Sequence, residues 1–228
     1  MNAVAIARGD LRARLGTRKG RVVQLAFAGA VWLVALLGVA PDREGESPLA
    51  PVSVGLLVVV AYLVTASAAG EIAFPGEKAV ADLVDSPFSA WQVALGKGLS
   101  TAGFALLCTA ACWPLLWFVH ALRGGSWEGA ASQAAVLLAV SWGFGGVATW
   151  IAAAVDSEVS RSVLLWGLVV VVLAGAPLVG SWAWHPAHAV LPSADGWARA
   201  VCAASFGLLG VVGLWLVQRH VARSRQPR

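Results

Sequence analysis

The chain has 228 residues, of which 59% are hydrophobic and 12% charged, with a mean hydropathy of +0.76 and a formal net charge of +4. Soluble domains carry about 25% charged residues, so this composition excludes a water-soluble globular protein. The basic residues lie in short clusters beside apolar stretches, which is typical of membrane-orientation signals and not of a nucleic-acid-binding surface. We therefore expect the lipid bilayer, and no nucleic acid, as a partner.

Residues 1–21 are predicted to form a cytoplasmic amphipathic helix on the membrane surface. Val4, Leu11 and Leu15 share one helical face, and arginines cover the other. The apolar run that follows, 22–40, is longer than the roughly 7–15-residue core of a signal peptide, and no small-residue cleavage site follows it. We interpret this run as a retained first transmembrane helix.

Five further stretches lack Asp, Glu, Lys and Arg over at least the length of roughly 20 residues that spans a bilayer. They are continuously apolar, whereas the strands of membrane barrels alternate, so they predict helices. The expected fold class is an all-α polytopic membrane protein in one transmembrane domain. Its six transmembrane helices are predicted at 22–40, 51–70, 98–122, 130–155, 162–180 and 200–218.

The distribution of basic residues predicts the orientation. Thirteen basic residues fall in the segments on the side of the N-terminus, and three, Arg43, Arg123 and Arg199, fall on the other side. Basic segments stay in the cytoplasm, so both termini are predicted to be cytoplasmic. The expected location is the plasma membrane (the cytoplasmic or inner membrane) of a prokaryotic cell.

The longest polar segment, 71–97, is predicted to lie in the cytoplasm. Within Glu77–Asp85, Val80, Leu83 and Val84 share one face of a short amphipathic helix. Ser86 and Pro87 are suited to the N-cap and first position of a second helix, 87–95, which leads through a Gly-Lys-Gly sequence into the third span. From pattern alone, an ordinary interfacial elbow between two spans remains the alternative.

Two motifs of this segment carry a resemblance. Ser86-Pro87-Phe88-Ser89 and Gly96-Lys97 resemble the membrane (permease) subunits of the type-2 ATP-binding cassette exporter family, in which a similar pattern joins the second and third spans. Phe74-Pro75 and Ala79-Val80 depart from the family pattern. His185-Pro186, after the fifth span, is a weaker match.

The resemblance implies a half-transporter that pairs with a second permease copy, identical or a close paralogue, and with two ATPase subunits. The segment after the second span would be the coupling helix that contacts the ATPase. The residues that take this place here are Glu77, Asp82, Leu83, Val84, Asp85, Ser86 and Pro87. A smaller second contact is expected from Asp156–Glu158 with Arg161.

The chain contains no phosphate-binding loop of the Gly-x4-Gly-Lys-(Ser/Thr) type. It is therefore expected not to be an enzyme and to bind no cofactor, with ATP and Mg²⁺ held by the partner. The spans also contain no Asp, Glu, Lys or Arg, which argues against an ion-coupled carrier. A path without fixed charges favours export of a lipid-like, peptide or amphiphilic substrate.

The run after residue 162 is too long for one crossing, so 181–198 is predicted to re-enter the bundle as an outer gate. The gate residues are Trp182, Trp184, His185 and His188. An aromatic belt with two interfacial histidines is the alternative. Trp113 and Trp117, on either side of Pro114, are candidates to line a substrate path.

Two other groups of residues suggest chemistry but have simpler interpretations. Cys108 and Cys112 with His120 permit a metal or haem site, yet small apolar residues on a helix face explain the cysteines as well. The glycines of 142–146 are interpreted as a close helix–helix contact. A haem-exporter-like permease of cytochrome c maturation and a non-transport membrane scaffold or assembly factor are the alternative functions.

Overall fold

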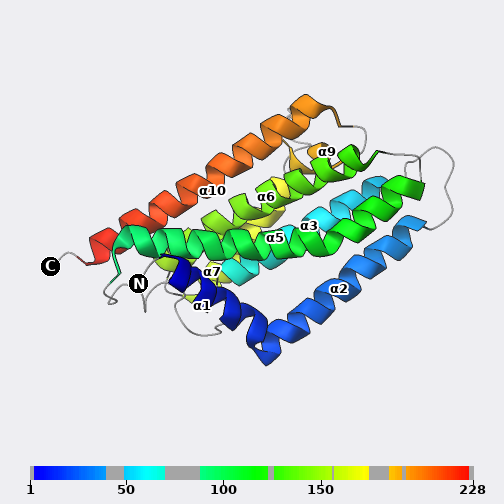
Figure 1. Ribbon diagram of the computed structural model, residues 1–228. Helices are drawn as coiled ribbons and strands as arrows, with labels where there is room; N and C mark the ends of the chain where they lie inside the picture. The colour runs from blue at the N-terminus through cyan, green and yellow to red at the C-terminus, as the bar shows by residue number, and fades with distance from the viewer. Residues whose placement is uncertain are drawn as a thin grey trace.

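The computed structural model describes residues 3–39, 49–69, 88–122, 126–155, 157–174, 185–191 and 194–225. Within these ranges every regular element is a helix, which confirms the all-α prediction (Figure 1). The helices are α1 (Ala3–Gly16), α2 (Arg18–Val39), α3 (Leu49–Ala68), α5 (Ala90–Leu122), α6 (Trp127–Ala154), α7 (Glu158–Ala174), α9 (Pro186–Ala189) and α10 (Gly196–Ser224).

In the described part of the chain, three segments are long and apolar enough to cross a membrane. They are Ala90–Phe118, Trp127–Ala154 and Gly196–Ser224, with 29, 28 and 29 residues. Shorter apolar helical segments lie in α2, α3 and α7, at Gln24–Leu33, Val52–Ala68 and Val159–Val172. These candidate spans indicate a multi-pass membrane protein.

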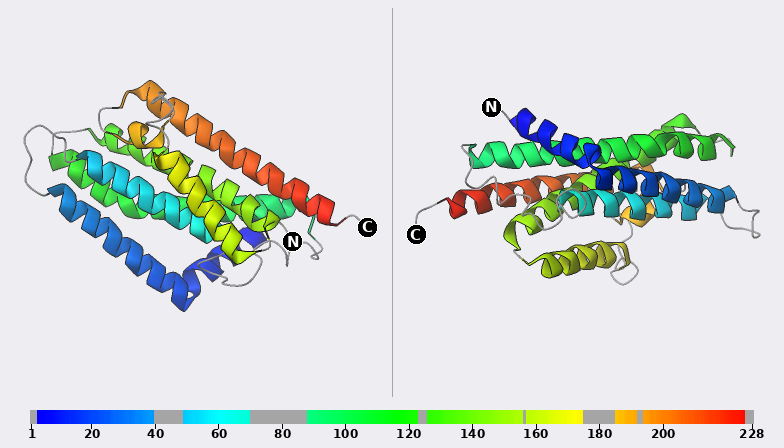
Figure 2. Two further views of the ribbon diagram at one scale, coloured as in Figure 1. Left: turned by 180° about the vertical axis from the view of Figure 1, so that it is seen from behind. Right: turned by 90° about the horizontal axis from the view of Figure 1, so that it is seen from below.

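Helices α3, α5, α6 and α10 form the centre of the bundle, and α2 and α7 lie at its edges (Figures 1 and 2). Helix α6 is the most deeply buried of the three long apolar helices. In its most apolar stretch 61% of the residues are buried, against 44% in that of α5 and 28% in that of α10. Phe144 and Leu137 of α6 and Leu56 and Leu57 of α3 are among the largest fully buried side chains. Helix α1 begins and α10 ends at the same end of the bundle, which we call the basic end; α3 ends and α5 begins toward this end as well.

Glycines bring α6 and α10 into backbone contact. A Cβ atom placed on Gly146 would lie 2.7 Å from the carbonyl oxygen of Gly210, and one on Gly143 would lie 2.6 Å from that of Phe206. Only residues without a side chain permit so close an approach. The prediction that the glycines of 142–146 serve helix packing is confirmed.

Helix α5 differs from its prediction. It runs without a break from Ala90 to Leu122, so the prediction of a helix 87–95 separate from the third span is wrong. Gly96 and Gly98 are instead close-contact points, because a Cβ on Gly96 would meet Ile6 of α1 and one on Gly98 would meet Leu214 of α10. Packing neighbours therefore explain these glycines better than a turn does.

Helix α1 also differs from a simple surface helix. Leu11 and Leu15 pack on the apolar core as predicted, but Val4 is 64% exposed. Asp10 and Arg14 are buried, with 8% and 4% of their surface exposed, so the prediction that arginines cover only the outer face is wrong for Arg14. The reason lies in α3 and α5, which supply polar partners for Arg14 and Asp10 that periodicity within α1 cannot reveal.

Candidate functional site

A buried ion cluster joins α1 to α3 and α5. The Asp10 carboxylate accepts hydrogen bonds from Lys97 Nζ at 2.9 Å, from Arg14 Nη2 at 2.7 Å and from Ser100 Oγ at 2.5 Å. Arg14 Nη1 also donates to Ser67 Oγ of α3 at 2.9 Å. One carboxylate therefore serves two cations, and the cluster connects segments 87 to 90 residues apart in the chain.

The electrostatics keep Asp10 and Arg14 charged. Burial raises the pKa of Asp10. The charges of Arg14 and Lys97 and the hydrogen bonds from Ser100 and Lys97 lower this pKa by more than burial raises it, so it lies below the ordinary value of 3.8. Burial lowers the pKa of Arg14, whereas Asp10 raises it, and a guanidinium stays cationic at neutral pH. Charges this deeply buried persist because they are paired and hydrogen-bonded.

Two arginines hold the ends of the segment that joins α3 to α5. Arg161, at the start of α7, is 6% exposed and donates long hydrogen bonds of 3.4 Å to the Ala69 carbonyl and 3.5 Å to the Val155 carbonyl. Arg225, at the end of α10, donates to the Phe88 carbonyl. Ala69 and Phe88, the described residues on either side of 70–87, are thus tied to α7 and α10.

The predicted coupling residues Glu77, Asp82, Leu83, Val84, Asp85, Ser86 and Pro87 lie outside the described residues. Of the Ser86-Pro87-Phe88-Ser89 motif, the structure describes only Phe88 and Ser89. The Ser89 hydroxyl accepts a hydrogen bond from the backbone N–H of Gln92 at 3.2 Å. In return, Gln92 Oε1 accepts one from the backbone N–H of Ser89 at 3.0 Å. This reciprocal capping box starts α5 at Ala90, so the predicted start of this helix at Ser86-Pro87 is wrong.

The structure describes only part of the smaller contact expected from Asp156–Glu158 with Arg161. Asp156 lies outside the described residues, and the Arg161 side chain is buried against backbone carbonyls of its own chain. The expected contact of this segment with a partner stays a prediction.

At the opposite end, α9 is buried among other helices. Gln133 of α6 donates to the Val190 carbonyl at 2.7 Å and accepts from His120 Nε2 at 2.9 Å. His185 is 1% exposed and donates from Nε2 to the Val172 carbonyl at 2.9 Å. Burial lowers the pKa of His185, the hydrogen bond to Val172 raises it, and the nearby His188 lowers it, with a net decrease.

These contacts place two of the four predicted gate residues. His185 and the partly buried His188 lie with α9, whereas Trp182 and Trp184 fall outside the described residues. A fully buried His185 differs from the interfacial histidine of an aromatic belt. The gate role itself stays a prediction.

The other sequence candidates have ordinary surroundings. Cys108 and Cys112 are buried in the apolar core, as their interpretation as small apolar residues requires. No group of three or more His, Cys, Asp or Glu side chains that could hold a metal occurs among the described residues. Trp113 packs partly buried against the core, and Trp117 is 43% exposed.

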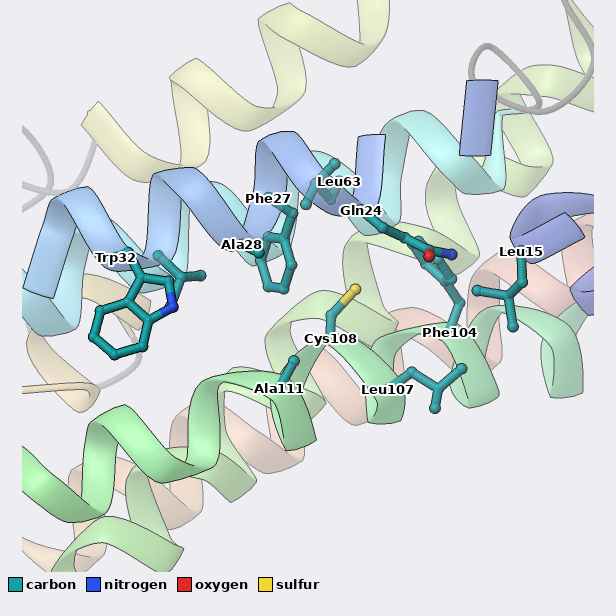
Figure 3. Close-up of a pocket in the computed structure, with 11 residues that line it drawn as sticks. Leu15, Gln24, Phe27, Ala28, Trp32, Leu63, Phe104, Leu107, Cys108 and Ala111 are labelled. Carbon is teal, nitrogen blue, oxygen red and sulfur yellow. The ribbon is translucent and has the colours of Figure 1, made fainter. Parts of the chain in front are cut away.

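A cavity of about 390 Å³ lies between α2 and α5. Figure 3 shows Phe27, Ala28 and Trp32 of α2 on one side and side chains of α5 on the other, with Leu15 of α1 at one end. The α5 residues that line it are Phe104, Leu107, Cys108 and Ala111; Leu63 of α3 closes its back. Trp113 and Trp117, the predicted path-lining residues, do not line this cavity.

No protein-family model matches the chain, and no curated protein matches it.

Sequence reasoning missed most residues of the basic end. Asp10, Ser67, Ser100 and Arg225 were not singled out, because each acquires its partner only when distant segments fold together. The one available signal was a lysine between two glycines at the edge of an apolar span. Its burial requires a carboxylate somewhere else in the chain.

Proposed function

We propose that this chain is the permease subunit of an ATP-driven exporter of the ATP-binding cassette type. It would work as a dimer with a second permease copy and with two ATPase subunits that bind ATP and Mg²⁺. The cargo would be a lipid-like, peptide or amphiphilic molecule, since the predicted spans carry no fixed charge. The resemblance of Ser86–Ser89 and Gly96-Lys97 is the starting point of this proposal.

The proposal includes six transmembrane helices, with α2, α3 and α7 crossing in addition to α5, α6 and α10. An even number of crossings agrees with α1 and the end of α10 lying at the same end of the bundle. The excess of basic residues assigns that end to the cytoplasm of a prokaryotic cell.

The observation that carries the proposal is the attachment of the 70–87 segment. Lys97 of the Gly96-Lys97 motif is buried in an ion pair with Asp10, and Arg161 and Arg225 hold the carbonyls at the two edges of the segment. A force applied to this segment would therefore reach α3, α5, α7 and α10 together. Rigid transmission of this kind is what converts closure of a partner into movement of packed helices.

The test is to isolate the complex through a tagged full-length chain in its native host and identify the partners by mass spectrometry. We expect an ATPase subunit to copurify. Leu83→Asp places a carboxylate in the expected apolar contact, so copurification should fall by about tenfold or more. Ser224→Asp, on an exposed part of α10 at the same end, is the matched control and should leave the complex intact.

Each other outcome removes part of the proposal. A stable complex without an ATPase would favour the membrane scaffold or assembly factor, and copurification with cytochrome c maturation proteins would favour the haem-exporter-like permease. An ATPase bound equally well by Leu83→Asp would assign coupling to another segment.

A further inference from the structure

The cavity between α2 and α5 has no role in the proposed coupling. Its lining is apolar except for Gln24 and the Cys108 thiol, and its volume of about 390 Å³ is in the range of ordinary ligand pockets. It is bounded by helices that lie against lipid, since Trp32 of α2 and Leu107 of α5 are 69% and 48% exposed. An apolar chain is the matching occupant, because water finds almost no polar partner there.

One end of the cavity is polar and basic. Gln24 and Leu15 lie toward this end, close to the junction of α1 and α2 (Figure 3). Arg21 is seven residues before Ala28 and eleven before Trp32, so helical periodicity places all three on one face of α2. Arg21 thus continues the lining face, about 10 Å along the axis from Ala28.

A second arginine lies one helical turn from Arg21, since Arg18 begins α2. Arg12 of α1 lines a separate hollow with Leu11 and Leu99. Arg18 and Arg21 are exposed and make no ion pair with any residue that the structure describes. Arg14, by contrast, is buried and bound to Asp10. The cavity therefore combines an apolar interior with a cationic mouth.

We propose that this cavity binds an anionic phospholipid, with one acyl chain between α2 and α5 and the phosphate at Arg18 and Arg21. The charge arrangement selects an anionic headgroup over a zwitterionic one, since each basic residue near a lipid surface adds about fivefold in affinity. The lipid would fill the gap beside α2 and hold the α1–α2 junction at the membrane surface. This inference does not depend on the transport function.

Binding is measured by native mass spectrometry of the delipidated full-length protein, titrated with dioleoyl phosphatidylglycerol or dioleoyl phosphatidylcholine. We expect one phosphatidylglycerol to be retained per chain and phosphatidylcholine to be retained more weakly. Ala28→Phe fills the cavity and should abolish retention, whereas Ala204→Phe, at an exposed position of α10 outside the cavity, should not change it. Arg21→Gln should weaken phosphatidylglycerol binding about fivefold.

Phosphatidylglycerol with a photoreactive acyl chain tests the same site without any substitution. Cross-links should map to the α5 peptide that contains Phe104 and Ala111 and to the α2 peptide that contains Ala28. Equal retention of the two lipids, unchanged binding by Ala28→Phe, or lipid cross-links confined to other helices would each overturn the proposal. A cavity covered by a second copy of the chain would also overturn it, and would appear as protection of these peptides in the dimer.

Discussion

Helices α6 and α10 pack closely for a different reason from helices α1 and α5. Between α6 and α10 the helices meet because side chains are absent, and Gly146 faces the backbone of Gly210. Between α1 and α5 they meet because charged side chains are present, with Asp10 bonded to Lys97. The glycine interface depends on shape and tolerates no added atom, whereas the ion cluster depends on a single carboxylate that balances two cations. Substitutions should therefore affect them in different ways.

The largest effect is expected from Asp10→Asn. The change leaves Arg14 and Lys97 buried without a counter-ion, and breaking a buried pair costs about 3–5 kcal/mol. The measurement is the free energy of unfolding in mixed micelles titrated with a denaturing detergent. Asp195→Asn is the matched control, because Asp195 caps α10 through the Ala198 amide and Asn caps equally well.

Adding Lys97→Met to Asp10→Asn should recover part of the lost stability, because one buried charge is removed. A double variant as unstable as the sum of the single variants would show that the two side chains act independently.

A smaller effect is expected from Gly146→Ala. The new methyl group would lie 2.7 Å from the Gly210 carbonyl oxygen, and overpacking of this kind costs about 1–3 kcal/mol. Gly207→Ala, on α10 with nothing within 4 Å of the added atom, is the control and should be neutral or more stable by up to about 1 kcal/mol. Equal unfolding midpoints for the two variants would contradict the close α6–α10 contact.

The smallest effect is the pH dependence of the ion cluster. Because the folded-state pKa of Asp10 lies below its ordinary 3.8, the stabilisation by this group is complete above that value and is lost as pH falls through the folded-state pKa. Each pKa unit corresponds to about 1.4 kcal/mol. The difference in unfolding free energy between wild type and Asp10→Asn should stay constant from pH 7 to pH 5 and shrink below pH 4, whereas Gly146→Ala should show no such change.

Features encoded within one helix could be predicted from the sequence. The apolar runs predicted helices, and the small residues around Phe144 predicted a close contact because a stretch of small residues is visible locally. Features that require two distant segments could not be predicted. Lys97 and Asp10 are 87 residues apart, and nothing in the pattern of α1 shows that Arg14 turns inward. The continuity of α5 was missed for the same reason, since Gly96 is explained by Ile6 and not by its own neighbours.

The hydrogen bonds from Arg161 and Arg225 end on main-chain carbonyls, a group that every amino acid possesses. Residues 69 and 88 can therefore be exchanged without removing the acceptor, and the sequence between them carries no requirement from these two bonds. If the segment between them contacts an ATPase as proposed, its sequence can therefore change to suit a different ATPase while both bonds are kept.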